Sequence, residues 1–367
     1  MSFSIETPLV GIDVPPAQIE STLRNLWRKE AELGGENALL KTSTLNLVIL
    51  GLDESRFVDL AQAALQVSNH HPSRVIMVYL TRENARQICA RVSVLCHISS
   101  STKKQLTGEL IQLQIGAEEI EHLPGIVLPS LLPNLPRYLY LPDGFGFKDH
   151  LFFGFDSAFD RTIIDSERHC RFGARLHDVL DHVESIGQSQ RVLDLTWARM
   201  TPWREAVAQF FDHEPDCSLL NRLSHITVLA HGNQARYFAS LFIAWIASRL
   251  KWEIFPQRDR LSIKDGRSMP IALVIEAEPS HAGAAVLRKV ELVAHSGEMT
   301  VRYVAECPSG HEIVCYAQEG DQVIPHSTLR LSELSESKLL CEELDFLEPD
   351  KIYIEAIRAL RKTEMDR

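Results

Sequence analysis

The sequence predicts an α/β fold: a mostly parallel mixed sheet with flanking helices, followed by an α+β domain that ends in an antiparallel meander. Short apolar segments alternate with longer amphipathic ones over the first 165 residues, as in sheets whose parallel strands are joined by helices. Strand-like segments separated by short turns follow one another between residues 271 and 318, which indicates the meander. A chain of 367 residues is long enough for two cores. We place the boundary after Asp165, so the expected domains are residues 1–165 and 166–367.

The first domain is expected to begin with a helix that Pro15-Pro16 opens and Gly34-Gly35 ends, with Ile19, Leu23 and Trp27 on its apolar face. Beyond it, runs rich in β-branched and aromatic residues mark strands. The expected elements are a strand at 46–50, a helix at 53–68, a strand at 74–80, a hairpin of 90–98 and 108–115, a helix at 117–131, a strand at 137–141, a helix at 148–158 and a strand at 161–165.

The second domain is expected to open with a helix at 168–185 and to contain a helix at 234–250 that is apolar nearly all round, and therefore central and buried. Residues 256–270 are rich in polar residues, proline and glycine, which indicates a loop. The remaining expected elements are strands at 191–197, 225–230, 271–278, 286–294, 299–306 and 311–318, a helix from Pro202, and a final helix at 350–362.

The charge of the chain argues against nucleic-acid binding. The formal net charge is −11, and residues 271–367 hold 18 acidic and 10 basic residues, a net charge of −8. An acidic C-terminal third argues against a nucleic-acid partner, which needs a basic patch, and is compatible with docking onto a basic surface of another protein.

We expect no membrane segment and a cytoplasmic location. The longest apolar-rich stretch, Tyr237 to Ala247, is too short to span a bilayer. Residues 1–7 lack the basic start and apolar core of a signal peptide. The seven cysteines form no CxxC pair, and an odd number without a regular framework favours reduced thiols.

No catalytic or cofactor motif is complete. The sequence contains neither a GxxxxGKS/T loop nor a GxSxG elbow, and Gly144-Phe145-Gly146 is more typical of a flexible turn than of a phosphate site. His177 with Asp181, and Asp178 with His182, have the i,i+4 spacing of metal ligands on a helix. Without a third ligand, solvated helix pairs are the preferred interpretation.

Two further groups of possible ligands are also incomplete. Cys307 and His311 bracket a tight turn, but no second ligand pair follows, which disfavours zinc. Asp165 ends a strand and, with Asp156 and Asp160, offers carboxylates for sugar hydroxyls or Mg²⁺. The preferred interpretation is that Asp165-Ser166 caps the next helix. We therefore predict that the chain folds without a metal and binds no cofactor.

The richest segment runs from residue 194 to residue 204 and is called here the tryptophan-arginine segment. It combines Asp194, Trp197, Arg199, Trp203 and Arg204, and Trp and Arg dominate protein interfaces. Internal packing is the alternative: both tryptophans would fill the core, and the aspartate would pair with one of the arginines. Packing is preferred for the tryptophans, while at least one arginine is expected to project outward as a partner-binding residue.

The same segment indicates its own secondary structure. Alternation of apolar residues over 191–197 predicts a strand that carries Trp197. Thr201 is expected to cap a helix whose first residue is Pro202, with an apolar face formed by residues 203, 206, 207, 210 and 211.

A second candidate surface is the run His71-Pro72-Ser73-Arg74, just before a predicted strand. Proline keeps the preceding histidine extended. Ligands of parallel sheets bind beyond the carboxyl ends of the strands, so this amino-terminal end is the wrong place for a phosphate. His71, Ser73 and Arg74 are therefore interpreted as a structural or partner-facing loop.

Five patches, in order, make the chain similar to the OpcA family, the glucose-6-phosphate dehydrogenase assembly proteins. They are HPSRVI at 71–76, LPSLLPNLP at 128–136, IIDS at 163–166, the tryptophan-arginine segment with its sequel AQFFD at 208–212, and AWIASRL at 244–250. One departure is Asn134, where the family pattern has aspartate.

The resemblance implies a non-enzymatic assembly factor or allosteric activator of glucose-6-phosphate dehydrogenase, the entry enzyme of the oxidative pentose phosphate pathway. Two alternatives stay open from the residues. One is a sugar-phosphate or nucleotide-binding enzyme that uses the first sheet, since fold does not determine function. The other is a scaffold that binds the dehydrogenase without changing its activity.

Overall fold

A computed structural model shows that the chain forms two compact units. The first comprises Met1–His169, Arg191–Leu195 and Ser335–Glu348, and the second comprises Cys170–Gln190, Thr196–Leu334 and Pro349–Arg367. The units alternate along the sequence, and the domain boundary expected after residue 165 stays a prediction. The residues that the structure describes are 11–34, 43–51, 56–81, 88–98, 104–143, 155–171, 180–181, 183, 192–212, 216–232, 234–257, 260–264, 271–278, 286–331, 335–345, 348 and 350–365.

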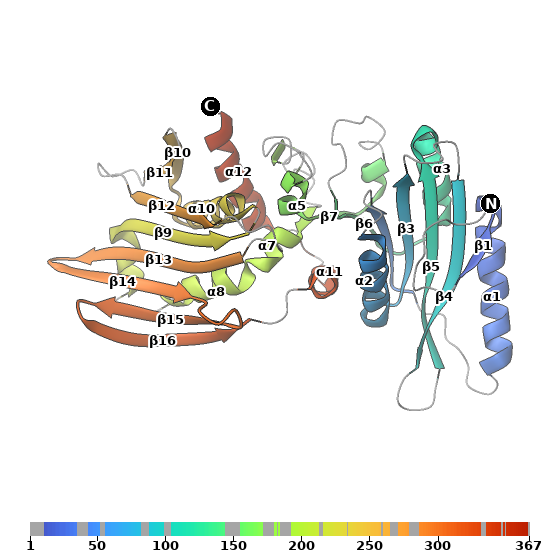
Figure 1. The fold of residues 1–367 in the computed structure, drawn as a ribbon, viewed down its shortest axis with the longest axis horizontal. Helices are drawn as coiled ribbons and strands as arrows, with labels where there is room; N and C mark the ends of the chain where they lie inside the picture. Colours follow the sequence, from blue (N-terminus) through green and yellow to red (C-terminus); the bar gives the residue numbers. More distant parts are fainter. Residues whose placement is uncertain are drawn as a thin grey trace. The chain divides into compact units, whose positions relative to one another are not determined.

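One eight-stranded sheet forms the centre of the first unit, with strand order β1-β4-β5-β3-β2-β6-β7-β8 (Figure 1). All neighbours from β5 to β8 are parallel, whereas β4 is antiparallel to β5 and β1, which confirms the mostly parallel mixed sheet and the predicted hairpin. The strands are β1 Ile12–Val14, β2 Leu45–Gly51, β3 Ser73–Thr81, β4 Ile88–Ile98, β5 Lys104–Gly116, β6 Arg137–Leu141, β7 Arg161–Ile164 and β8 Val192–Asp194.

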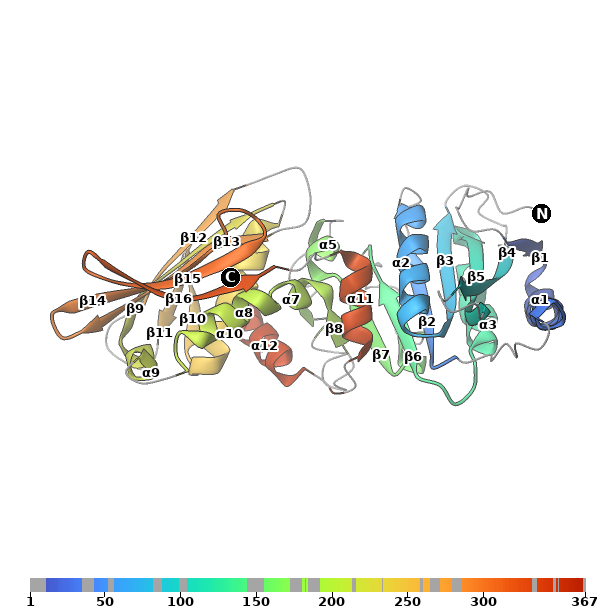
Figure 2. The ribbon, with the colours of Figure 1, turned by 90° about the horizontal axis from the view of Figure 1, so that it is seen from below.

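Helices cover both faces of this sheet. On one face α2 (Phe57–His70) packs beside α11 (Glu336–Asp345) (Figure 2). On the other face α1 (Ile19–Gly34) packs against β4 and β5: Ser73 of β3 bonds Ser68 of α2, whereas the next residue, Arg74, bonds Glu20 of α1. The sequence did not predict α11. Central strands are covered on both sides, so β2 is buried at every position, as its continuous apolar run requires.

The helix predicted over 117–131 is divided into three pieces. A 3-10 helix η3 (Ala117–His122), a short α3 (Leu123–Val127) and a second 3-10 helix η4 (Leu128–Ser130) follow one another. Pro124 and Pro129 each lie in the first turn of a new piece, where the missing N–H is tolerated but a continuing helix is not.

Two predicted helices are described only in part. The 3-10 helix η5 (Asp156–Ala158) falls at the end of the helix expected over 148–158, and residues 148–154 lie outside the described part. Likewise α5 (Ser166–Arg171) precedes residues 172–179, which are not described, so the remainder of the predicted 168–185 helix stays a prediction. Asn134 adopts a left-handed φ of 60°, a conformation that asparagine tolerates well.

A buried ion-pair network fastens α1 to this sheet. Arg74 donates from Nε to Glu109 Oε2 at 2.6 Å and from Nη1 to Ser130 O at 2.6 Å and Glu20 Oε1 at 2.5 Å. Glu109 is fully buried and also accepts the indole N–H of Trp27. A buried carboxylate is tolerated only when donors surround it in this way.

A six-stranded sheet with the order β12-β9-β13-β14-β15-β16 forms the second unit. Parallel pairing joins β12 and β9, and every other neighbouring pair is antiparallel, which confirms a mostly antiparallel sheet with a meander over β13 to β16. The prediction that the meander starts at residue 271 is wrong, because β12 pairs with β9 and not with β13. The strands are β9 Leu223–His231, β12 Ala272–Glu278, β13 Val286–Ser296, β14 Met299–Glu306, β15 Glu312–Glu319 and β16 Gln322–Arg330. The sequence did not predict the edge strand β16, whose Pro325 lies beside an irregularity in the register, as prolines in sheets usually do.

The predicted polar loop at 256–270 is wrong over its first part, because β10 (Glu253–Gln257) and β11 (Arg260–Lys264) form a hairpin there. Pro256 suggested a loop, yet both strands of a two-stranded sheet are edges, and an edge strand accepts a proline. Residues 265–270 lie outside the described part.

Helices α8 (Thr201–Gln209) and α10 (Ala235–Leu250) pack on the sheet of the second unit, and α12 (Lys351–Met365) packs on α10. Every residue from 237 to 247 is buried, which confirms the predicted central helix. Two short helices, α9 (Asp216–Leu219) and the 3-10 helix η6 (Leu220–Arg222), precede β9. Across the described ranges, no helix has both the length and the apolarity to cross a membrane.

We expect Arg74→Met to destabilise the first unit by about 3–5 kcal/mol, because the substitution leaves the buried Glu109 carboxylate without its guanidinium. Arg91→Met is the matched control: its pair with Asp13 is partly exposed, so the loss should stay below about 1 kcal/mol. Urea unfolding measures both free energies. Equal losses for the two variants would contradict a structural role for the buried pair.

A second prediction concerns pH. His169 is fully buried and donates from Nε2 to Leu141 O at 2.9 Å, and burial lowers the pKa of its imidazole from the ordinary value of 6.5. The imidazole of His169 therefore stays neutral in the native state. Below pH 6.5 it becomes protonated in the unfolded state but not yet in the native state. Stability should fall as the pH drops from 6.5 toward the native pKa, by up to about 1.4 kcal/mol per pH unit.

The His169→Gln variant keeps an N–H donor and cannot be protonated, so it should flatten this dependence in urea unfolding at pH 7, 6 and 5. The His311→Gln variant, at an exposed turn, should leave the slope as it is. An unchanged slope in His169→Gln would refute the assignment.

Candidate functional site

The tryptophan-arginine segment passes from one unit to the other. It starts at the end of β8, continues through α7 (Leu195–Arg199) and enters α8, and the chain crosses between Leu195 and Thr196. The predicted strand over 191–197 is therefore wrong beyond Asp194, and Trp197 lies on a helix. Every residue from 192 to 200 is buried, and when all sides are buried an apolar run does not distinguish a strand from a helix.

Asp194 holds the start of α5 in place. Its Oδ1 accepts the backbone N–H of Ser166 at 3.1 Å, and its Oδ2 accepts the Ser166 hydroxyl at 2.6 Å. The aspartate is 1% exposed, so these donors satisfy a buried charge. The pairing of Asp194 with Arg199 or Arg204 stays a prediction.

Trp197 joins three helices of the second unit. Its indole Nε1 donates to Asp350 Oδ2 at 2.6 Å, and its ring centroid lies 5.4 Å from that of Tyr353 on α12. The guanidinium carbon of Arg204 on α8 lies 3.5 Å from the ring centroid, the geometry of a cation–π contact. Asp350 also accepts the backbone N–H of Tyr353 at 3.0 Å and so caps α12. Trp197 is 4% exposed, as internal packing requires.

Of the arginines, Arg204 is half-buried and Arg199 is only 7% exposed. Arg199 Nη2 donates to Thr196 Oγ1 at 3.2 Å, and Arg204 Nη2 donates to Thr201 Oγ1 at 2.8 Å. Arg199 thus lies inside the structure, whereas Arg204 keeps some contact with solvent. Trp203 is 3% exposed and belongs to the core.

The start of α8 also differs from the prediction. Met200 occupies the N-cap position, no side chain caps the helix, and Pro202 lies in the first turn. The Thr201 hydroxyl instead accepts a hydrogen bond from Arg204. The predicted apolar face is confirmed, because Trp203, Ala206, Val207 and Phe210 are buried and Phe211 is half-buried.

The second candidate loop has partners within the first unit. His71 Nε2 lies 3.1 Å from Cys341 O and 3.6 Å from Asp345 Oδ1, both on α11. Ser73 is fully buried, with its hydroxyl 3.2 Å from that of Ser68, and Arg74 is 2% exposed in the network described above. A partner-binding role for these residues stays a prediction, and the structure gives each of them an intramolecular contact.

Sequence reasoning missed most of a third place, the carboxyl edge of the parallel strands, where it considered Asp165 but not Arg56, Asp143 or Glu336. The run β5-β3-β2-β6-β7-β8 has the 3-2-1-4-5-6 order of doubly wound sheets, in which ligands bind beyond the strand ends at the point where the order reverses. That point lies between β2 and β6. Arg56 follows β2 at the N-cap of α2, and Asp143 follows β6.

A carboxylate of the protein occupies this point. Arg56 bonds Asp143 through Nη1 and Glu336 Oε2 through Nη2, and Tyr140 donates its hydroxyl to Glu336 Oε1 at 2.5 Å. Burial raises the pKa of Tyr140, and the charge of Glu336 raises it further. For Arg56, burial works to lower the pKa, but the carboxylates of Glu336 and Asp143 outweigh it and raise the pKa above its ordinary value.

Further charges balance the same edge. Arg168 Nε lies 3.2 Å from Asp165 Oδ2, and Arg168 Nη2 lies 3.8 Å from Glu336 Oε2. The segment after β2 reads Gly51-Leu52-Asp53-Glu54-Ser55-Arg56, with one glycine and two acidic residues. A dinucleotide pyrophosphate needs several glycines and bare backbone N–H groups at this position. At this edge the carboxylates of Asp143, Glu336 and Asp165 neutralise the charges of Arg56 and Arg168.

The possible carboxylate cluster of Asp156, Asp160 and Asp165 does not form. Asp160 precedes β7 and accepts the backbone N–H of Arg137 at 2.9 Å, whereas Asp165 follows the same strand. Strand steps of about 3.3 Å each therefore keep the two carboxylates at opposite ends of β7.

The other possible ligands do not form a metal site among the described residues. Cys307 is buried and His311 is exposed, and no group of three or more His, Cys, Asp or Glu side chains in the described ranges is placed to hold a metal. The glycine pair at 144–146 and the helical pairs around 177–182 involve residues outside the described part.

Two family models match the chain. The glucose-6-phosphate dehydrogenase subunit N-terminal domain matches residues 64–181, and the C-terminal domain of the same subunit matches residues 190–357. An OpcA protein of Synechocystis sp. is 28% identical over 188 residues, 51% of this chain and 38% of the relative. One of Synechococcus elongatus is 30% identical over 199 residues, 53% of this chain and 44% of the relative. The chain thus spans less than half the length of these curated relatives.

Solved structures with a similar fold are distant. The transcriptional regulator Gal80p of Kluyveromyces lactis is 9% identical with a TM-score of 0.46, over 93% of this chain and 94% of that chain. Likeness at this level supports no conclusion. The two family models, in contrast, account for residues 64–357 apart from 182–189, so this chain belongs to the OpcA family of glucose-6-phosphate dehydrogenase subunit proteins.

Proposed function

We propose that this chain is a non-catalytic partner of glucose-6-phosphate dehydrogenase that promotes the assembly or activation of the enzyme, in the cytoplasm. The observation that carries the proposal is the match of both halves of the chain to domains described as those of a glucose-6-phosphate dehydrogenase subunit. The OpcA relatives are named as proteins of the OxPP cycle, which places them in the same pathway.

The charge arrangement at the carboxyl edge of the first sheet supports a role without catalysis. An enzyme of this topology would bind its nucleotide where Glu336 meets Arg56 and Tyr140. A phosphate that entered there would have to displace the half-buried carboxylate of Glu336 and would meet the buried Asp143 as well. Like charges at this distance repel strongly in a partly buried site.

Activation requires differential binding. A partner activates the dehydrogenase only if it binds the active conformation or oligomer more tightly than the inactive one, and a tenfold shift needs about 1.4 kcal/mol. A protein interface of ordinary size, about 1,600 Å² in total, is sufficient. The half-buried Arg204 beside Trp197 is the residue of the tryptophan-arginine segment best placed to contribute, since arginines are enriched at interface hot spots.

The purified full chain should show no turnover of glucose 6-phosphate with either nicotinamide cofactor, and should increase the activity or the oligomer size of the dehydrogenase when the two are mixed. Coupled absorbance assays and size-exclusion chromatography measure these effects. The Glu336→Gln variant is a sharper test of the edge, because it removes the occluding charge; it should still show no turnover. Oxidation of glucose 6-phosphate by the chain alone would exclude the proposal.

Arg204→Met should weaken activation of the dehydrogenase at least tenfold, while it lowers stability only by the roughly 0.5–2 kcal/mol of a cation–π contact. Asp350→Ala is the matched control, because it removes the hydrogen bond of the Trp197 indole together with a helix cap. That variant should lose about 1–3 kcal/mol and, when folded, should activate like the parent. If Arg204→Met activates the dehydrogenase as the parent does, the segment is structural.

A further inference from the structure

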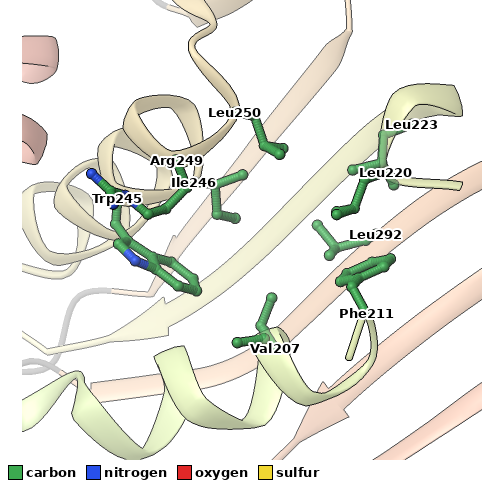
Figure 3. A pocket seen from close by; sticks show the side chains of 10 residues that line it. Val207, Phe211, Leu220, Leu223, Trp245, Ile246, Arg249, Leu250 and Leu292 are labelled. Atoms are coloured by element: carbon green, nitrogen blue, oxygen red, sulfur yellow. The ribbon is translucent and has the colours of Figure 1, made fainter. Parts of the chain in front are cut away.

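An apolar pocket of about 250 Å³ opens in the second unit between α8, α10 and the sheet (Figure 3). Its walls are aliphatic and aromatic, and they include Val207 of α8, Phe211 in the turn after that helix, Trp245 and Ile246 of α10, and Leu292 of β13. Figure 3 shows these side chains around a common space. Four of them are buried and Phe211 is half-buried, so the pocket is a feature of the packed unit.

The rim of the pocket carries two exposed residues, Ala208 and Arg249. Arg249 forms an ion pair with Glu355 of α12, and the side chains are 38% and 52% exposed. Exposed pairs of this kind contribute little free energy, so an incoming carboxylate can compete for the guanidinium at small cost. The site thus combines an apolar interior with one charged lining residue, Arg249, whose guanidinium pairs with Glu355.

Two patches that carry the family resemblance meet at this pocket. Ala208 and Phe211 belong to the AQFFD patch that follows the tryptophan-arginine segment, and Trp245, Ile246 and Arg249 belong to the AWIASRL patch. The pocket also lies entirely within the residues matched by the C-terminal domain of the dehydrogenase subunit family.

We infer that this pocket receives an aromatic side chain of glucose-6-phosphate dehydrogenase, presented next to an acidic residue that pairs with Arg249. The inference rests on the proposed function for the identity of the partner. Interfaces of proteins are commonly anchored by an aromatic residue in a desolvated pocket, surrounded by contacts that contribute less.

Size and chemistry select this occupant. Apolar cavities of about 150 Å³ stay dry and bind benzene, so 250 Å³ accommodates an aromatic ring with its linking carbon. The lining offers no hydrogen-bond partners to the hydroxyls of a sugar or to a phosphate, and a polar group buried without partners is strongly disfavoured. The exposed guanidinium of the lining residue Arg249 favours a carboxylate near the ring.

The test compares the binding of the dehydrogenase by the full parent chain and by Ala208→Trp, in which an exposed residue of the rim is enlarged so that it fills the pocket. Glu205→Trp, an equally large substitution at an exposed position of α8 that does not line the pocket, is the control. Calorimetric titration should give equal Kd values for the parent and Glu205→Trp, and a Kd at least roughly 20-fold higher for Ala208→Trp. Thermal melting establishes that the variants are folded.

A second variant keeps the test decisive if Ala208→Trp does not fold. Arg249→Gln leaves the pocket open, and it should weaken binding about tenfold. The free compound 3-phenylpropionate, a phenyl ring with one carboxylate, should compete with the dehydrogenase for the parent chain.

Binding by Ala208→Trp as tight as by the parent overturns the inference and leaves the proposed function intact. A parent chain that does not bind the dehydrogenase overturns both. Capture of 3-phenylpropionate without competition against the dehydrogenase identifies a small-molecule site and excludes the enzyme as the occupant.

Discussion

The buried guanidinium of Arg56 is the constraint on which much of the first unit depends. The residue is 9% exposed at the carboxyl edge of the parallel sheet, and a buried cation without a counter-charge is disfavoured by several kcal/mol. Asp143 supplies one carboxylate from the end of the neighbouring strand β6, and Glu336 supplies the second from 280 residues further along the chain. This requirement gives a physical reason for the return of the chain to the first unit at Ser335, after the meander of the second unit is complete.

The same return bears on function. In a doubly wound sheet the reversal point collects helix N-termini and strand ends, which is why nucleotides bind there. Here the carboxylate of Glu336, on α11, lies at that point, and Tyr140 and Arg56 donate hydrogen bonds to it. The carboxylate of Glu336 thus supplies the negative charge that a bound phosphate would supply in a nucleotide-binding protein. A sheet edge that is neutralised internally is consistent with the proposed role as a partner of an enzyme.

Elements that depend on local pattern could be predicted from the sequence, and those that depend on distant partners could not. The buried runs of β2 and β3 and the all-round apolar α10 are continuous in the sequence, so their structure follows from composition. Helix α11 carries an apolar side formed by Leu339, Leu340 and Leu344, but this run is short, and the partner that buries it, α2, lies far away in the sequence. Apolar residues alternate over 191–197, which predicts a strand, but residues 195–197 are helical, because alternation carries no information where every side of the chain is buried.

The candidate site shows the same division. Composition identified the tryptophan-arginine segment, yet it did not distinguish the buried Arg199 from the half-buried Arg204, since both follow a tryptophan closely in the sequence. The exposure of each arginine side chain depends on the face of its helix from which it projects. On α8, Trp203 points into the core, Arg204 points to the ring of Trp197, and Val207 points into the apolar pocket. Three side chains of one short helix therefore lie in three different surroundings: the core, the ring of Trp197 and the apolar pocket. Composition alone cannot distinguish these surroundings.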